Sequence, residues 1–305
     1  MRLWLMAARP RTLPAAIAPV LVGSAAAYQE IDRPACILVV GVECPSFRWL
    51  AFIAALIGSI FIQIGTNLAN DYSDARRGAD TADRLGPVRV TSSGLVAPRR
   101  VLVATWVAFA VAVAAGIYLA TVAGVVILIV GAASILAGVL YTGGPRPYGY
   151  EGLGELFVFL FFGLVAVNGS YYVQLERLDW LPFGLSLAVG FLATAILVVN
   201  NVRDLETDRR AGKMTLAVRL GRRRTRSLYA LLIVAAFAAV PITLLAAEGP
   251  AWGLLVLLAA PLVRRPLSAV MTRTDGPSLN GALAGTGALL AAFSALLAAG
   301  LVIAA

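Results

Sequence analysis

Asparagine and aspartate side chains gather at the end of one apolar run, in the stretch "NLANDYSD" at 67–74, called here the first motif. Its polar members are Asn67, Asn70, Asp71 and Asp74. These positions follow the spacing i, i+3, i+4 and i+7, which places them on one face of a helix. A single acidic residue at a helix end is usually a cap or a solvated charge. A stripe of four is a candidate polar site.

A second stretch, "NNVRDLETDRRAGKMT" at 200–215, repeats this pattern. Asn201, Asp204 and Asp208 follow at i, i+3 and i+7, and Asn200 lies four residues before Asp204. We call 200–208 the second motif. Each motif ends an apolar run and precedes a loop rich in arginine and glycine. The spacing of about 133 residues indicates a weak internal repeat, and two matching stripes favour one shared site.

The chemistry of the two motifs points to a hard cation. Facing carboxylates repel one another unless a cation lies between them, and ligand sets of oxygen alone favour Mg²⁺. The chain has no histidine, and Cys36 and Cys44 lack metal-site spacing. Mg²⁺ usually completes its shell with water and substrate phosphate. Nearby arginines and Lys213, the only lysine, can bind phosphate. The motifs therefore predict a magnesium diphosphate whose lipid tail extends between helices.

Composition and run length define the elements that must position these side chains. The chain is 60% hydrophobic and 13% charged, whereas soluble domains carry about 25% charged residues. Apolar runs near 20 residues fit an all-α polytopic membrane protein with a single domain over 1–305. We predict nine transmembrane helices at 11–28, 50–70, 101–120, 122–141, 153–173, 181–202, 228–247, 250–270 and 281–304. The eighth is the weakest, because Pro261 and Arg264–Arg265 shorten it.

Charge distribution predicts the orientation. With the N-terminus in the cytoplasm, 22 of the 25 basic residues fall in cytoplasmic segments, and only Arg33, Arg48 and Arg177 do not. This asymmetry follows the positive-inside rule and places the C-terminus outside. The net charge of +9 is therefore interpreted as a mark of the cytoplasmic face of a cell membrane, not of nucleic-acid binding. Cys36 and Cys44 fall near one outer loop, and the sequence leaves open whether they form a disulfide or stay as two free thiols.

The two motifs resemble those of the UbiA-type intramembrane prenyltransferases. Further similar stretches are "ARPRTLPAAIAPV" and "YTGGPRPYGYEGLGELFVFLFFGLVAVNGSYYVQ". The resemblance implies nine helices around a central cavity that opens laterally to membrane lipid. It is strongest for the branch that transfers a polyprenyl group from polyprenyl diphosphate to 1,4-dihydroxy-2-naphthoate in menaquinone biosynthesis, releasing diphosphate and carbon dioxide.

The resemblance also implies roles for particular residues. Mg²⁺ would be held by the carboxylates Asp71, Asp74, Asp204 and Asp208, with Asn67, Asn70 and Asn201 matching the rest of the motifs. Arg84, Arg89 and Lys213 would neutralise the diphosphate, and Arg146 is a candidate for the acceptor carboxylate or a structural arginine. The chain departs from the wider family at Gly78, where many members carry a third aspartate, and Asp80 follows two residues later. Aromatic side chains at 157–172 could line an isoprenoid tunnel or face lipid.

Other functions remain open from the sequence. A sister prenyltransferase could use homogentisate or a haem as its acceptor. A CDP-alcohol phosphotransferase would need a denser aspartate motif than this chain carries. A secondary transporter, the alternative that is not an enzyme, predicts inverted repeats and polar groups near the bilayer midplane. Here the repeat is parallel and the acids lie at one face, which favours the prenyltransferase.

Overall fold

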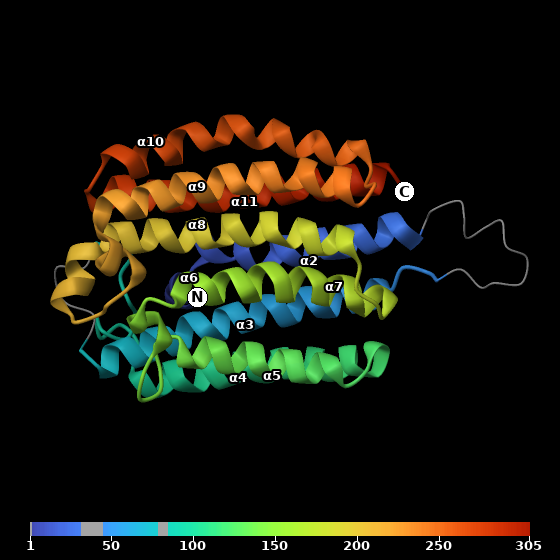
Figure 1. The fold of residues 1–305 in the computed structure, drawn as a ribbon. Helices are drawn as coiled ribbons and strands as arrows, with labels where there is room; N and C mark the ends of the chain where they lie inside the picture. The colour runs from blue at the N-terminus through green and yellow to red at the C-terminus, as the bar shows by residue number, and fades with distance from the viewer. Residues whose placement is uncertain (1, 32–44, 79–84) are drawn as a thin grey trace, which may run out of the picture.

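The computed structural model describes residues 2–31, 45–78 and 85–305, and its regular structure is helical throughout (Figure 1). The elements are α1 (Arg2–Ala8), the 3₁₀ helix η1 (Pro10–Thr12), α2 (Pro14–Ile31), α3 (Trp49–Arg76), α4 (Pro98–Ala123), α5 (Val126–Leu140), the 3₁₀ helix η3 (Tyr148–Glu151), α6 (Gly154–Val158), the π-helix η4 (Phe159–Val165), α7 (Ala166–Leu175), α8 (Trp180–Arg210), α9 (Leu216–Ala246), the 3₁₀ helix η5 (Ala251–Val263), α10 (Arg264–Thr272) and α11 (Gly276–Ile303).

Each apolar range predicted to cross the membrane overlaps a helix of the structure. Seven described helical runs are long and apolar enough to span a bilayer: α3, α4, the run α6–η4–α7, α8, α9, the run η5–α10, and α11. Of the two remaining ranges, 122–141 corresponds to the 15-residue helix α5 and 11–28 to the 18-residue helix α2. An all-helical membrane architecture is thus confirmed at the level of these seven helices.

The ends of the helices differ from the predicted ranges at three places, and the first two matter for the site. Helix α3 continues to Arg76 and α8 continues to Arg210, so both motifs lie on helix and their stripes are real helical faces. The expected shortening of the eighth range does not occur. Instead η5 passes directly into α10 at Arg264, with Pro261 inside the 3₁₀ segment, and the combined run extends to Thr272.

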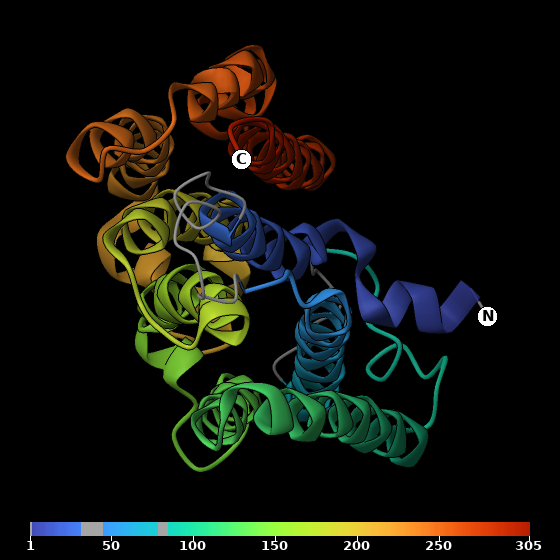
Figure 2. The ribbon, with the colours of Figure 1, turned by 90° about the vertical axis from the view of Figure 1, so that its right-hand side faces the viewer.

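The helices lie side by side, and α8 is at the centre of the main hydrophobic core (Figures 1 and 2). Along α8, Leu185, Val189, Leu192 and Val199 are completely buried. Helix α8 packs along α9, α3 packs along α4, and α11 packs against η5 and α2. Viewed end-on in Figure 2, α2, α3, the α4–α5 pair and the α6–α7 run are arranged in a ring, with α8 beside α2 and the α6–α7 run. This arrangement brings the ends of α3 and α8 together.

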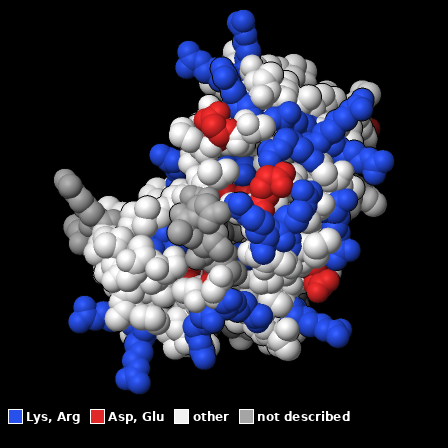
Figure 3. Space-filling view, turned by 90° about the vertical axis from the view of Figure 1, so that its left-hand side faces the viewer, with Lys and Arg blue, Asp and Glu red and all other residues white. Residues whose placement is uncertain are grey.

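Basic side chains gather at one end of this bundle. Figure 3 shows Lys and Arg spread over the face where α3 and α8 end and α9 begins, with only a few acidic side chains among them. The last turn of α8, the loop to α9 and the first turns of α9 contribute Arg209, Arg210, Lys213, Arg219, Arg222, Arg223 and Arg224. Both motifs therefore open toward the positively charged end of the molecule.

Candidate active site

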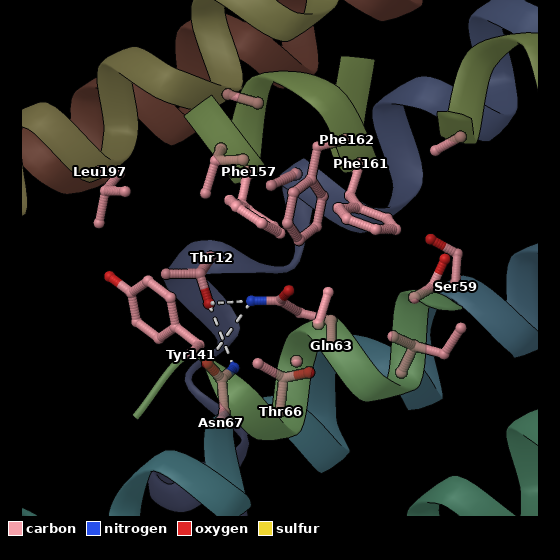
Figure 4. Close-up of a pocket in the computed structure, with 18 of the residues that line it drawn as sticks. Thr12, Ser59, Gln63, Thr66, Asn67, Tyr141, Phe157, Phe161, Phe162 and Leu197 are labelled. Carbon is pink, nitrogen blue, oxygen red and sulfur yellow. Dashed lines mark hydrogen bonds between the residues drawn. The ribbon is translucent and has the colours of Figure 1, made fainter. Parts of the chain in front are cut away.

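A cavity of about 350 Å³ lies between the helices and reaches both motifs. Its lining comes from α2, α3, α4, α5, the α6–η4–α7 run and α8, from the N-terminal segment at Arg9 and Thr12, from Leu283 of α11 and from the loops at the charged end. In Figure 4, Phe157, Phe161 and Phe162 form an aromatic wall, and the polar side chains Gln63 and Asn67 of α3 lie across from it. The cavity is therefore apolar along one side and polar toward the motifs.

The aromatic wall is an ordered stack. Tyr148 packs on Phe157 with ring centroids 4.0 Å apart, and Phe157 packs on Phe161 at 6.1 Å. The Tyr148 hydroxyl donates to the carbonyl oxygen of Ala137 at 2.8 Å, and burial raises the pKa of Tyr148 well above its usual value. Phe159 points elsewhere and packs on Phe191 of α8. The sequence left open whether the aromatic side chains at 157–172 line a tunnel or face lipid. Phe157, Phe161 and Phe162 face the cavity, whereas Phe159 packs between helices.

The two asparagines of the first motif are held in fixed orientations. Asn67 donates from Nδ2 to the carbonyl oxygen of Ala8 at 3.0 Å and to Oγ1 of Thr12 at 3.4 Å. Asn70 accepts a 2.8 Å hydrogen bond at Oδ1 from the hydroxyl of Thr142. Both asparagines are buried and line the cavity. The N-terminal segment and the loop after α5 therefore fix the orientations of the Asn67 and Asn70 side-chain amides on α3.

Asp74 is the most heavily bonded carboxylate of the site, and it is only 1% exposed. Its Oδ2 accepts from Arg89 at 3.0 Å and lies 3.4 Å from Nζ of Lys213. Its Oδ1 accepts from the hydroxyl of Tyr150 at 2.5 Å. Two of the three predicted diphosphate contacts, Arg89 and Lys213, thus meet on one aspartate. Charge-assisted bonds of this kind are among the stronger ones in proteins.

Asp71 has a different environment, although it lies three residues before Asp74. Its carboxylate accepts from the backbone N–H groups of Val90 at 3.1 Å and Thr91 at 3.2 Å. It is 2% exposed and is not part of the cavity lining. Asp71 therefore fastens the loop that follows α3, and that loop carries Arg89.

The second motif is held by partners from other segments. Asn201 donates from Nδ2 to Oε1 of the buried Glu155 at 2.8 Å. Asp204 accepts from Arg203 at 2.8 and 2.6 Å. Arg203, only 1% exposed, also bonds Asn200 and Asn280 at 2.7 Å each. Asn200, Asn201, Asp204 and Asp208 all line the cavity, and Asp208 is half-buried.

Comparison with known proteins identifies the family to which this site belongs. Residues 16–279 match the sequence profile of the UbiA prenyltransferase family. The chain belongs to this family. A protein of Mycobacterium tuberculosis described as 1,4-dihydroxy-2-naphthoate octaprenyltransferase is 43% identical over 93% of this chain and 91% of its own length. A protein of Escherichia coli with the same description is 38% identical over 94% and 91% of the two chains.

Solved structures of UbiA homologues share the fold. The homologue from Archaeoglobus fulgidus, bound to GPP and Mg²⁺, superposes with a TM-score of 0.62 at 17% identity and covers 98% of this chain and 99% of its own. The apo homologue from Aeropyrum pernix K1 superposes with a TM-score of 0.66 at 14% identity, covering 99% and 98%. The resemblance noted in the motifs is thus confirmed, and the chain is a multi-pass membrane protein of the UbiA family.

The structure brings most of the expected UbiA site residues to one cavity. Asn67, Asn70, Asp74, Arg89, Asn201, Asp204, Asp208 and Lys213 all line it. Arg146 is exposed and lies outside the lining, so its proposed contact with an acceptor carboxylate stays a prediction. Arg84 and Asp80 lie outside the described residues, as do Cys36 and Cys44, so their predicted roles and the possible disulfide also stay predictions.

Three residues of the site were not assigned roles from the sequence. Tyr150 bonds Asp74, Glu155 bonds Asn201, and Arg203 bonds Asp204. Tyr150 and Glu155 lie in the stretch "YTGGPRPYGYEGLGE", which resembles the family but shows no periodic pattern that predicts a partner. Arg203 was counted only as one of many basic residues at a helix end. Its position next to Asp204, inside the second motif, was the available signal.

The donor set fits Mg²⁺ by its chemistry. The carboxylates of Asp74, Asp204 and Asp208 share one cavity with the side chains of four asparagines. Within the described ranges, no three His, Cys, Asp or Glu side chains form a cluster close enough to hold a metal ion by themselves. Asp74 is instead neutralised by Arg89 and Lys213, and Asp204 by Arg203. A site of this kind suits an ion whose remaining ligands come from water and a substrate diphosphate.

Proposed function

We propose that this protein is an intramembrane aromatic prenyltransferase of menaquinone biosynthesis. It transfers a polyprenyl group from polyprenyl diphosphate to 1,4-dihydroxy-2-naphthoate, with release of diphosphate and carbon dioxide. The observation that carries the proposal is a single cavity that joins both acidic motifs to an aromatic, apolar wall. The names of relatives at 38% and 43% identity supply the acceptor.

The polar end of the cavity is suited to hold a diphosphate. Asp74, Asp204 and Asp208 would hold Mg²⁺, which supplies positive charge for the leaving diphosphate. Arg89 and Lys213 already lie on Asp74, and phosphate oxygens are equally good partners for their N–H groups. Donors fixed before the reaction cost no reorganisation when charge develops on the leaving group. This chain's cations therefore orient the diphosphate and stabilise its departure.

The apolar part of the cavity is suited to the prenyl chain and the allylic carbon. The stacked rings of Tyr148, Phe157 and Phe161 present their faces along one wall. Ring faces attract cationic charge and exclude water, which would otherwise capture the allylic cation. The electron-rich naphthoate ring attacks that carbon, and the acceptor's carboxylate leaves as carbon dioxide.

We also propose that the chain crosses the membrane nine times, with α2 and α5 as the two crossings beyond the seven long helical runs. The N-terminus and the charged end shown in Figure 3 face the cytoplasm, and the C-terminus lies outside. The basic segments support this orientation, because they alternate with the helices along the chain. The site then lies at the cytoplasmic face of the cell membrane, where a soluble acid and a lipid donor can both reach it.

A competition assay tests the function. Purified protein is given one long polyprenyl diphosphate, Mg²⁺ and equal concentrations of 1,4-dihydroxy-2-naphthoate, 4-hydroxybenzoate and homogentisate. The naphthoate should be prenylated fastest, and removal of Mg²⁺ with EDTA should abolish turnover until Mg²⁺ is restored. Faster prenylation of a single-ring acid would reject the acceptor while retaining the prenyltransferase class.

A further inference from the structure

One short segment, 141–155, which runs from the end of α5 into the first turn of α6, bonds side chains of both motifs. Thr142 donates to Asn70 at 2.8 Å and Tyr150 donates to Asp74 at 2.5 Å, both in the first motif. Glu155 accepts from Asn201 of the second motif at 2.8 Å. Since the two motifs come from helices more than 100 residues apart, this segment is a physical connection between them.

Tyr150 connects these parts of the site most closely, because its hydroxyl, its ring and its carbonyl oxygen each make a contact. Its hydroxyl bonds Asp74, and its ring lies under Lys213, with Nζ 4.8 Å from the ring centroid. Its carbonyl oxygen accepts from the N–H of Met214 at 2.9 Å. Nζ of Lys213 lies in turn 3.4 Å from Oδ2 of Asp74. Tyr150, Asp74 and Lys213 thus form a closed triangle whose members come from three separate segments.

The triangle restrains a side chain that is otherwise flexible. Lysine carries a compact charge on a stem of four carbons, so a single ion pair leaves it many conformations. The ring of Tyr150 removes much of this freedom, since a cation over an aromatic face is held electrostatically. Lys213 is only 7% exposed, and Asp74 is 1% exposed. The ring therefore supports Lys213 from one side while the carboxylate attracts it from the other.

We propose that Tyr150 is a positioning residue that fixes Lys213 and Asp74 relative to each other, and so aligns the first motif and the loop after the second motif on one diphosphate. This inference rests on the proposed function, because that function gives Lys213 its phosphate and Asp74 its metal ion. The hydroxyl fixes the orientation of the Asp74 carboxylate, and the ring fixes the position of the Lys213 ammonium group. The two parts can be removed separately by substitution.

Three variants separate these contributions. Tyr150→Phe removes the hydroxyl and keeps the ring, whereas Tyr150→Leu removes both. Tyr229→Phe is the matched control, because Tyr229 is also buried and its hydroxyl lies 2.9 Å from Oγ1 of Thr286. Tyr229 and Thr286 join α9 to α11 and are not part of the cavity lining. The control therefore loses a buried tyrosine hydroxyl without touching the triangle.

The first measurement does not depend on turnover. Lys213 is the only lysine, so an N-hydroxysuccinimide ester acylates one side chain, and peptide mapping separates it from the N-terminal amine. Without Mg²⁺ and substrate, Lys213 in Tyr150→Leu should be acylated about tenfold faster than in the unchanged protein, because the ring no longer holds the ammonium group. Tyr150→Phe and Tyr229→Phe should react within about twofold of the unchanged protein.

The second measurement separates kcat from KM. Tyr150→Phe should lower kcat about tenfold, the effect of losing one hydrogen bond to a charged group, and leave the KM of the donor within about twofold. Tyr150→Leu should lower kcat and also raise the KM of the donor, since Lys213 is no longer fixed. Tyr229→Phe should match the unchanged protein in both.

Two results would overturn the inference: acylation of Lys213 in Tyr150→Leu at the unchanged rate, or turnover of Tyr150→Phe equal to that of Tyr229→Phe. If Tyr150→Leu does not fold, the isosteric Phe variant decides by its kcat. If the unchanged protein prenylates no acceptor, the proposed function fails, and the acylation rates still decide whether Tyr150 positions Lys213.

Discussion

Two aspartates of the first motif, three residues apart, have different partners. Asp74 faces the cavity and meets two cations and a hydroxyl. Asp71 accepts hydrogen bonds from two backbone N–H groups of the loop after α3, those of Val90 and Thr91. A carboxylate that accepts hydrogen bonds from backbone amides is suited to hold a loop in place. A carboxylate surrounded by cationic side chains can exchange them for a metal ion, and those side chains can then bind a phosphate. The same helical stripe thus contains one acid bonded to a loop and one acid bonded to cations, and the predicted Mg²⁺-ligand roles of both stay predictions.

Titration with Mg²⁺ distinguishes these two aspartates. Asp74→Asn should raise the Mg²⁺ concentration needed for half-maximal turnover about tenfold or more, because a carboxylate ligand becomes a neutral amide. Asp71→Asn should lower turnover at every Mg²⁺ concentration without that shift, since its amide nitrogen cannot accept from the loop and Arg89 is released. Loss of such a bond costs about 1.5–3 kcal/mol. An equal rise in the Mg²⁺ requirement in both variants would make Asp71 a metal ligand as well.

At the scale of the elements, the aromatic wall depends on close approach of η4 to α8. A Cβ atom added at Gly163 of η4 would lie 2.7 Å from the Cα of Gly190 and 2.9 Å from the carbonyl oxygen of Ser186. These neighbours are backbone atoms of α8 and cannot rotate away. Small residues at helix contacts allow this kind of packing in membrane proteins. The π-helical turn then directs Phe161 and Phe162 into the cavity.

Substitution of the contact glycine tests this packing. Gly163→Ala should lower the midpoint of thermal unfolding in detergent by several degrees, because overpacking at a rigid contact costs about 1–3 kcal/mol. Gly281→Ala is the matched control: it also lies in a helix, and no atom within 4 Å would meet its added Cβ. That control should unfold at the original temperature or slightly above it, since alanine is the better helix former. Equal midpoints for the two variants would show that η4 can move away from α8.

At the scale of the whole molecule, local sequence patterns predicted the helices but not the side-chain contacts between segments far apart in the chain. The i, i+3, i+7 stripes placed Asp74 and Asp208 on helical faces because helix geometry is local. The contact of Tyr150 with Asp74 joins residues 76 positions apart, and no periodicity in the sequence encodes that distance. Arg203 shows the same limit, since its partner Asn280 lies 77 positions further along the chain. Such contacts depend on how the helices are arranged in space.

The proposed nine crossings make a prediction that the ends of the chain alone cannot test, because seven and nine crossings both place the termini on opposite sides. The segments on either side of α5 decide more. Val125 and Arg146 are both exposed. With α2 and α5 as crossings, 146 shares a side with the N-terminus, and 125 shares a side with the C-terminus. Without both crossings, 125 and 146 share the side of the N-terminus.

Single cysteines test this arrangement directly. Cys36 and Cys44 are first replaced by serine, and Arg146→Cys or Val125→Cys is then introduced. In right-side-out vesicles a membrane-impermeant thiol reagent should label Val125→Cys and not Arg146→Cys, and inverted vesicles should reverse the result. Reporter fusions should place the N-terminus inside and the C-terminus outside, as the basic segments require. Labelling of both cysteines from one side would remove α5 from the count. An N-terminus on the same side as Val125 would remove α2 from the count.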